Sequence, residues 1–219
     1  AALMRKMGVE VKLNTPAPSV DELKAQGYTH IFFAVGAWKA GNLRISGNVK
    51  PVIAWMQAVK AGKPEPLGHV AVVGGGNTAM DAARLALRAG AASSTLVYRR
   101  TRKYMPADAE ELELAVADGV QFLELVSPVE QRDGKLICRK MVLGEPDASG
   151  RRSPAETDET VEILCDTVIS AVGEKVDTEV LAAYGIAADS RGCPDFRTNL
   201  ENVYTGGDVF RGPATVVEG

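Results

Sequence analysis

The sequence of 219 residues is 46% apolar and 24% charged, a balance that is typical of soluble globular proteins and excludes a disordered chain. Because the formal net charge is −3, no overall positive field would draw the protein to nucleic acid or to an anionic membrane. The three cysteines include no Cys-x-x-Cys pair, and no apolar run approaches the roughly 20 residues of a membrane-spanning helix, so we expect a cytoplasmic protein without structural disulfides or a metal site.

Before residue 69 the sequence predicts short elements that alternate between helical and extended. They are a helix over 3–7, an extended segment over 9–13, a helix over 19–25, a buried strand over 31–35 and a helix over 51–61. Proline and glycine are frequent in residues 62–68, which predicts a linker and therefore a domain boundary.

From residue 69 on, the pattern favours a parallel sheet followed by antiparallel strands. The predicted elements are strand 69–73, helix 77–89, strand 94–98, helix 106–118, strand 120–126, extended runs over 129–132, 135–143 and 160–165, and a buried strand over 167–172. Asp133-Gly134 predicts a hairpin turn, and residues 147–154 predict a polar loop. We therefore predict an α/β fold in which a Rossmann-like domain carries an appended antiparallel meander.

A weak internal repeat links two distant strands. Residues 29–36 and 166–173 are similar, and both end in Ala-Val-Gly. Each segment taken singly is the ordinary end of a buried strand, but together they are what two related nucleotide-binding domains would produce.

The most specific motif is the glycine turn Gly74-Gly75-Gly76, which lies between a predicted strand and a predicted helix and continues into Asn77-Thr78. With Ala79 it matches the dinucleotide fingerprint G-x-G-x-x-G/A in the context that this fingerprint requires. The helix start would present unpaired N–H groups to a pyrophosphate. The alternative is a glycine turn that binds no ligand.

The residues that follow the second strand of this βαβ unit indicate which dinucleotide fits. An NAD site would place Asp or Glu there for the ribose hydroxyls. This chain has Arg99-Arg100 instead, with Arg102 and Lys103 close behind. Guanidinium groups pair with a 2′-phosphate, so we predict a preference for NADP(H), the alternative being a solvated basic surface turn.

Other candidates are interpreted as structural. Thr205-Gly206-Gly207-Asp208 is a glycine turn after a strand-like segment, and His30 and His69 stand alone at strand starts. We predict no catalytic side chain and no metal-ligating cluster.

Four segments together resemble a known family. They are residues 69–81 (HVAVVGGGNTAMD), Tyr98-Arg99-Arg100 with Met105-Pro106-Ala107, residues 143–148 (LGEPDA) with Gly150-Arg151-Arg152, and Gly206-Gly207-Asp208. In this order they resemble the small (β) subunit of NADPH-dependent glutamate synthase, within the pyridine nucleotide-disulfide oxidoreductase superfamily. Similar segments occur in the flavin subunits of dihydropyrimidine dehydrogenase, of NADH-dependent ferredoxin:NADP oxidoreductase and of a selenate reductase.

The resemblance implies an NADPH-binding domain, residues 67–174, inserted into a partial FAD-type domain made of residues 1–66 and 175–219. It implies that Gly74, Gly75, Gly76, Asn77 and Thr78 bind the pyrophosphate, that Arg99 and Arg100 bind the 2′-phosphate, that Ala171, Val172 and Gly173 line the nicotinamide side, and that Gly207 and Asp208 contact the ribityl–pyrophosphate part of a flavin.

The activity implied for the longer parent protein is hydride transfer from NADPH to FAD, with electrons passed on through an iron–sulfur domain or a larger catalytic subunit. Because the cofactors carry this chemistry, no side chain is required as an acid or base. The sequence has no FAD fingerprint near its start and no cysteine-rich segment, so we expect the chain by itself to bind NADP(H), to lack FAD and to be inactive.

Two alternatives remain open from the sequence. A non-catalytic module that senses NADP(H) or holds a larger subunit would need the same fingerprint. A dithiol flavoprotein reductase of the thioredoxin reductase kind shares both nucleotide folds, but the absence of a Cys-x-x-Cys pair counts against it.

Overall fold

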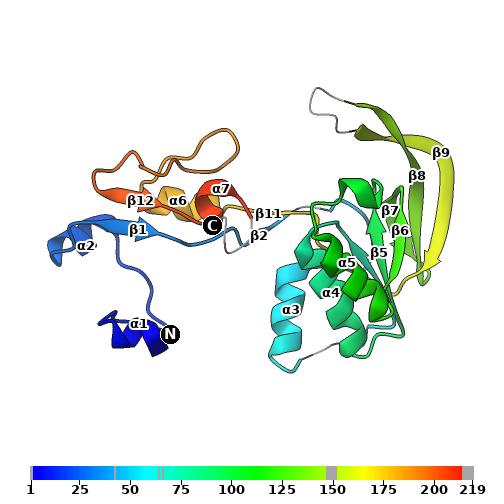
Figure 1. The fold of residues 1–219 in the computed structure, drawn as a ribbon, viewed down its shortest axis with the longest axis horizontal. Helices are drawn as coiled ribbons and strands as arrows, with labels where there is room; N and C mark the ends of the chain where they lie inside the picture. Colours follow the sequence, from blue (N-terminus) through cyan, green and yellow to red (C-terminus); the bar gives the residue numbers. More distant parts are fainter. Residues whose placement is uncertain (1, 42, 64, 66, 147–151, 214–219) are drawn as a thin grey trace. The chain divides into compact units, whose positions relative to one another are not determined.

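The computed structural model describes residues 2–41, 43–63, 65, 67–146 and 152–213 (Figure 1). The chain divides into two compact units. The first unit combines the segment up to Ala37 with the segment from Val176 onward, and the second unit runs from Trp38 to Lys175. An insertion of one unit into the other was predicted, but the predicted boundary at residues 66/67 is wrong, because the strand and helix between Trp38 and Lys63 pack within the second unit.

The first unit is small and is built around one pair of parallel strands. Its elements are α1 (Ala2–Lys6), α2 (Val20–Ala25), β1 (Ile31–Phe33), α6 (Thr178–Ala183), β12 (Val203–Thr205) and α7 (Asp208–Arg211). Strands β1 and β12 are parallel, and their inward side chains form an apolar cluster with Leu181 of α6 and Val209 of α7. The N-terminus of α2 forms as predicted, because the Ser19 hydroxyl accepts from the Glu22 amide in a capping box. The predicted extended segment 9–13 is not a strand.

The second unit holds a five-stranded parallel sheet and an antiparallel meander. Its elements are β2 (Lys39–Ala40), β3 (Val49–Pro51), α3 (Val52–Lys60), β4 (His69–Val73), α4 (Asn77–Arg88), β5 (Ser93–Tyr98), η1 (Arg102–Tyr104), α5 (Ala109–Ala117), β6 (Gln121–Glu124), β7 (Val126–Arg132), β8 (Lys135–Pro146), β9 (Arg152–Leu164), β10 (Thr167–Ser170) and β11 (Glu174–Lys175). The parallel sheet has the order β3-β10-β4-β5-β6, and the meander has the order β7-β8-β9. The predicted α/β class with an appended meander is confirmed.

Alternating side chains of the central strands produce three layers in the second unit. Val70 and Val72 of β4 belong to an apolar cluster with α3, α4 and α5, whereas Ala71 and Val73 belong to a cluster with the meander. Strand residues alternate between the two faces of a sheet, so one apolar strand supplies both clusters. Figure 1 shows the helices on one side of the sheet and strands β7, β8 and β9 on the other.

The meander is longer than the sequence predicted. Asp133 and Gly134 form the predicted hairpin turn, with φ of 52° and 71°, which are the positive values of a type I′ turn. Residues 152–154, predicted as part of a polar loop, begin β9 instead, because they pair with the end of β8. Residues 147–151 of that predicted loop lie outside the described residues. Helix α5 starts at Ala109 rather than at the predicted Pro106.

Candidate nucleotide site

The predicted nucleotide-binding residues of the second unit meet at one edge of its parallel sheet. Strand β4 has β5 on one side and β10 on the other, and all three run in the same direction. The chain proceeds from β4 through α4 to β5, and returns on the opposite side of β4 only at β10. The carboxyl ends of β4 and β10 therefore flank the point where the strand order reverses, which is where open α/β sheets bind ligands.

The glycine turn after β4 is shaped by close approaches that a side chain would prevent. Gly74 donates from its amide to the Val97 carbonyl at 3.1 Å, and a Cβ at Gly74 would overlap the carbonyl oxygen of Ala171, which follows the neighbouring strand β10. A Cβ at Gly75 would overlap the ring of Tyr98. Both glycines are therefore required by packing alone, before any ligand is considered.

Gly76 differs from the two glycines before it. It is the N-cap of α4, in an extended conformation with φ of −95°, and a Cβ built on it meets no atom within 4 Å. No side chain caps the helix at this position. The first amides of a helix have no acceptor within the helix, so those of Asn77 and Thr78, at the start of a helix of 12 residues, are available to donate to a ligand.

The side chain of Asn77 holds a neighbouring segment. Its Nδ2 donates to Oδ2 of Asp108 at 3.1 Å, and its Oδ1 accepts from the Asp108 amide at 3.0 Å. The adjacent Ala107 amide donates to the Gly75 carbonyl at 3.0 Å. The Met105-Pro106-Ala107 motif therefore lies against the glycine turn, and Asp108 is a residue of the site that the sequence analysis missed.

Tyr98, the last residue of β5, supports the same arrangement. Its ring packs against Gly75, and its hydroxyl donates to the Tyr104 carbonyl at 2.7 Å. The segment between β5 and α5 therefore contacts the glycine turn at its start, through Tyr98, and at its end, through Ala107 and Asp108. No sequence pattern predicted this role for Tyr98, because it depends on contacts between segments that are separate in the chain.

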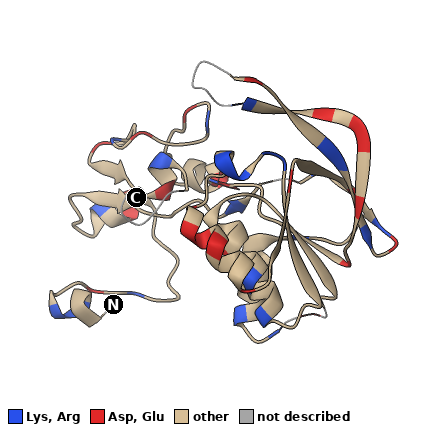
Figure 2. Ribbon diagram, turned by 45° about the vertical axis from the view of Figure 1, so that its right-hand side comes forward, with Lys and Arg blue, Asp and Glu red and all other residues tan. Residues whose placement is uncertain are grey.

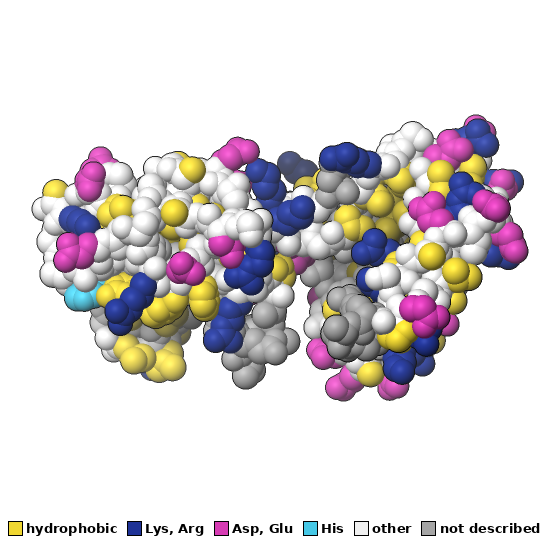
Figure 3. All heavy atoms as spheres, turned by 90° about the horizontal axis from the view of Figure 1, so that it is seen from above, with side chains coloured by type: hydrophobic (Ala, Val, Ile, Leu, Met, Phe, Trp, Pro, Cys, Tyr) yellow, Lys and Arg dark blue, Asp and Glu magenta, His cyan; other side chains and the backbone are white. Residues whose placement is uncertain are grey.

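Arg99 and Arg100 follow β5 at the same edge of the sheet. Arg99 is exposed, whereas Arg100 is half-buried and donates from Nε to the carbonyl oxygen of Arg152 at 3.3 Å. Arg102 and Lys103 lie in η1 just beyond them. Figure 2 colours the Lys and Arg residues blue and the Asp and Glu residues red along the chain, and Figure 3 shows both kinds of charged side chain on the face of the molecule that it presents.

Ala171, Val172 and Gly173 continue from the end of β10. The Ala171 amide donates to the Val73 carbonyl at 2.9 Å, so this segment lies directly beside the start of the glycine turn. The Gly173 carbonyl accepts from the Gly41 amide at 2.7 Å, and Gly173 has a φ of 89°. The structure therefore brings 171–173 together with Gly74 across two adjacent strands.

Gly207 and Asp208 belong to the first unit. Gly207 has φ of 69° and ψ of −152°, and it is the N-cap of the short helix α7. The preceding Gly206 donates to the Phe33 carbonyl at 3.1 Å and leaves no room for a Cβ beside the Phe32 ring. The turn is tied to the end of β1, and the role implied for it toward a flavin stays a prediction.

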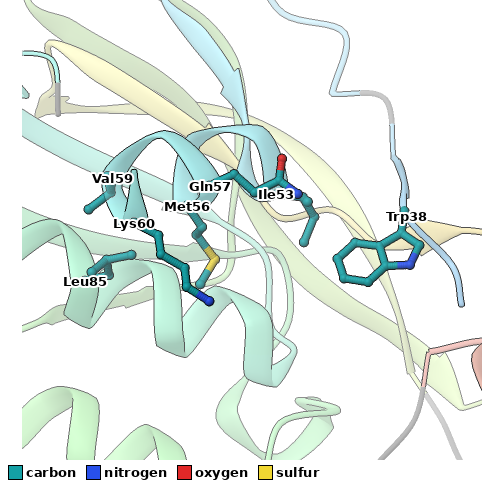
Figure 4. Close-up of a pocket in the computed structure, with 7 residues that line it drawn as sticks. All are labelled: Trp38, Ile53, Met56, Gln57, Val59, Lys60 and Leu85. Carbon is teal, nitrogen blue, oxygen red and sulfur yellow. The ribbon is translucent and has the colours of Figure 1, made fainter. Parts of the chain in front are cut away.

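An apolar pocket of about 520 Å³ lies elsewhere in the second unit. Its lining residues are Trp38, Ile53, Met56, Gln57, Val59, Lys60 and Leu85 (Figure 4). Helices α3 and α4 supply most of them, and Trp38 is 65% exposed. The pocket does not include the glycine turn or the arginines after β5.

Among the described residues, no group of histidine, cysteine and carboxylate side chains has the arrangement of a metal site. None of the helices in that part of the chain is long and apolar enough to cross a membrane.

The described thiols fall into two classes. Cys138 and Cys165 are buried between the sheet and the meander, and burial raises the pKa of Cys138 to about 12 and that of Cys165 to about 11. Cys193, in the first unit, is partly exposed. Because the thiolate is the reactive form and a reagent must reach it, Cys138 and Cys165 are poorly suited to reaction near neutral pH, whereas Cys193 is accessible.

We expect iodoacetamide at pH 8 to modify Cys193 in the native chain and to leave Cys138 and Cys165 unmodified. Peptide mass spectrometry before and after unfolding in guanidinium chloride measures this. All three thiols should react in the unfolded chain, which serves as the control. Modification of Cys138 in the native chain at the rate of Cys193 would contradict the buried position described here.

The pattern that defines the pyridine nucleotide-disulphide oxidoreductase family matches residues 5–219. The chain belongs to this family. The predicted superfamily is therefore confirmed.

Two relatives show which members of the family are similar to this chain. The YgfK protein of Escherichia coli (strain K12) is 44% identical over 213 residues, which cover 93% of this chain and 21% of that protein. The glutamate synthase [NADPH] small chain of the same organism is 32% identical over 247 residues, covering 96% of this chain and 52% of that protein. The chain therefore spans about a fifth to a half of the length of these relatives. The predicted resemblance to the glutamate synthase small subunit is confirmed.

A solved structure shows the same fold. FprA of Mycobacterium tuberculosis, in complex with NADPH, superposes with a TM-score of 0.72 at 22% identity, covering 91% of this chain and 62% of FprA. At this level of identity the similarity concerns the fold alone, and it supports the α/β architecture.

Proposed function

We propose that this chain is the NADPH-binding, electron-input part of a flavin and iron–sulfur oxidoreductase similar to the small chain of glutamate synthase. The observation that carries the proposal is the sheet edge where the glycine turn, the uncapped start of α4 and the arginines after β5 occur together. The relative with 32% identity is named for NADPH, which agrees with that site.

The residues present fit a phosphorylated dinucleotide. The extended Gly76, with open space where its side chain would be, lets a pyrophosphate approach the amides of Asn77 and Thr78. Arg99 and Arg100 provide planar donors for the 2′-phosphate, a group that NADH lacks. Residues 171–173, beside the glycine turn, would line the nicotinamide side.

NADPH supplies a hydride from its nicotinamide ring, and FAD in the parent protein would accept it. The chain's own residues position the nucleotide and exclude water from it, because such a transfer depends on alignment more than on an acid or a base. Gly207 and Asp208 would contact the flavin in a longer protein that supplies the rest of its site. We do not assign FAD binding to the present chain alone.

The partner we propose is an iron–sulfur domain or a larger catalytic subunit of the parent enzyme. The relative from Escherichia coli is a small chain, a name that indicates assembly with a larger one. The free thiols are compatible with the reducing cytoplasm, which we propose as the compartment. Neither nucleic acid nor a membrane is proposed as a partner.

We expect the 219-residue chain to bind NADP⁺ at least about tenfold more tightly than NAD⁺, because a pair of charge-assisted hydrogen bonds to the 2′-phosphate is lost with NAD⁺. Isothermal titration of the same preparation with each dinucleotide measures the ratio. Equal affinity for the two would refute the assignment of the arginines to the 2′-phosphate.

A module that only senses NADP(H), or that holds a larger subunit, would bind the nucleotide equally well. The parent protein with its FAD bound separates the two functions. In a stopped-flow instrument, an electron-input enzyme shows bleaching of the flavin absorbance after mixing with NADPH under anaerobic conditions. Binding of NADPH without bleaching would favour the sensor.

A further inference from the structure

The guanidinium group of Arg100 is held by a strand that is distant in sequence. Its Nε donates to the main-chain carbonyl of Arg152, the first residue of β9, at 3.3 Å. Arg100 is half-buried, and among the described residues its two terminal nitrogens have no acceptor. A guanidinium fixed at Nε keeps its outer pair of nitrogens for a planar, bidentate contact.

The main chain at Arg100 is attached to the same part of the molecule. The Arg100 carbonyl accepts from the Leu125 amide at 3.2 Å, and the Leu125 carbonyl accepts from the Met141 amide of β8 at 2.8 Å. Leu125 has a φ of 57°, a conformation that a leucine adopts only when its surroundings hold it there. The end of β5 is therefore attached to the meander through both its backbone and the Arg100 side chain.

The end of the β8–β9 hairpin is braced by the Arg152 side chain. Its Nη1 donates to the Gly144 carbonyl of β8 at 3.0 Å, and Arg152 pairs with Pro146 across the hairpin. The guanidinium of Arg152 therefore links the two strands close to the carbonyl that holds Arg100.

We propose that Arg152, at the start of β9, is a positioning residue for Arg100 in the 2′-phosphate site. This inference rests on the proposed function, because it concerns the same site. The Arg152 carbonyl orients the guanidinium of Arg100, and the Arg152 side chain keeps that carbonyl in place. Pre-orientation reduces the side-chain freedom that Arg100 loses when a phosphate binds, so it raises selectivity for the phosphorylated nucleotide.

The test compares binding of 2′,5′-ADP with binding of 5′-AMP, since only the former carries the 2′-phosphate. We expect Arg152→Ala to reduce the ratio of the two affinities by about threefold to tenfold, the range of one lost hydrogen bond. Arg139→Ala is the matched control, because Arg139 also donates from Nη1 across the same hairpin, to the Asp158 carbonyl at 3.4 Å. It should leave the ratio unchanged.

A second variant removes the segment that contains Arg152. Leu143 and Pro154 are paired, so residues 144–153 can be replaced by the turn Asn-Gly. The removed segment contains two acidic and two basic residues, and the formal net charge is therefore unchanged. We expect this shortened chain to lose most of its preference for 2′,5′-ADP while binding 5′-AMP as before.

A double variant distinguishes positioning from direct binding. If Arg152 acts through Arg100, then Arg100→Ala/Arg152→Ala loses no more of the affinity ratio than Arg100→Ala alone. Additive losses would overturn the positioning role. Unchanged ratios in both Arg152→Ala and the shortened chain, together with a loss in Arg100→Ala, would overturn this inference and leave the proposed function intact. A native chain without any preference for 2′,5′-ADP would overturn the proposed cofactor choice itself.

Discussion

Replacing Arg99 and Arg100 together by alanine is expected to weaken NADPH binding by about tenfold to a hundredfold and to leave NADH binding nearly unchanged. Both residues follow β5 at the edge of the sheet that carries the glycine turn, and Arg100 is held by a main-chain carbonyl. The phosphorylated adenosine loses its guanidinium partners in this variant, whereas NADH has no group that used them. Isothermal titration with the two reduced nucleotides measures the change.

The control for this variant is Arg139→Ala/Lys140→Ala, which removes an adjacent basic pair from β8 of the same unit. The change in formal charge is identical, so any effect of the general field appears in both variants. We expect the control to bind both nucleotides with nearly native affinity. Equal losses of NADPH and NADH affinity in the Arg99 and Arg100 variant would refute the assignment.

The second large effect concerns two glycines of the same turn, which should fail in different ways. Gly74→Ala is expected to destabilise the chain by about 1–3 kcal/mol, because its Cβ would overlap the Ala171 carbonyl oxygen and force β4 and β10 apart. Gly76→Ala is expected to fold with near-native stability, because a Cβ there meets no atom within 4 Å and its φ of −95° is accessible to alanine.

The same two variants should differ in binding. We expect Gly76→Ala to lose at least about tenfold in NADP⁺ affinity, because the new methyl group occupies the space through which the pyrophosphate approaches the backbone. Denaturant unfolding gives the stabilities, and titration gives the affinities. Native NADP⁺ affinity in Gly76→Ala would place the pyrophosphate away from this turn and contradict the site.

The elements that the sequence predicted well are those with strong local signals. Residues 69–98 carry an apolar strand, a glycine turn and an amphipathic helix in succession, and each forms within one residue of its predicted bounds. The Ser19 cap and the Asp133-Gly134 turn also follow from chemistry between near neighbours. Such signals depend little on the rest of the fold.

The predictions that failed concern features that depend on contacts between distant segments of the chain. Residues 9–13 alternate like a strand, but a strand also needs a neighbour to bond with, and the described structure provides none for them. The polar composition at the start of β9 predicts a loop, because it gives no sign of the pairing with β8 that the structure shows. The Pro- and Gly-rich segment 62–68 predicts a domain boundary. However, β3, which precedes this segment, pairs with β10, which lies more than a hundred residues after β3, so both strands belong to the same unit.

Sequence alone determined the fold class and the family, and it supplied the residues of the proposed nucleotide site, because a glycine turn between strand and helix and a pair of arginines after the next strand are local patterns with local physical reasons. Tertiary structure decided which side chains support that site. The Asn77–Asp108 pair, the Tyr98 ring on Gly75 and the Arg152 carbonyl on Arg100 join segments that only folding brings together. Hydrogen bonds and close packing act over a few ångströms in space, and no spacing along the chain encodes them.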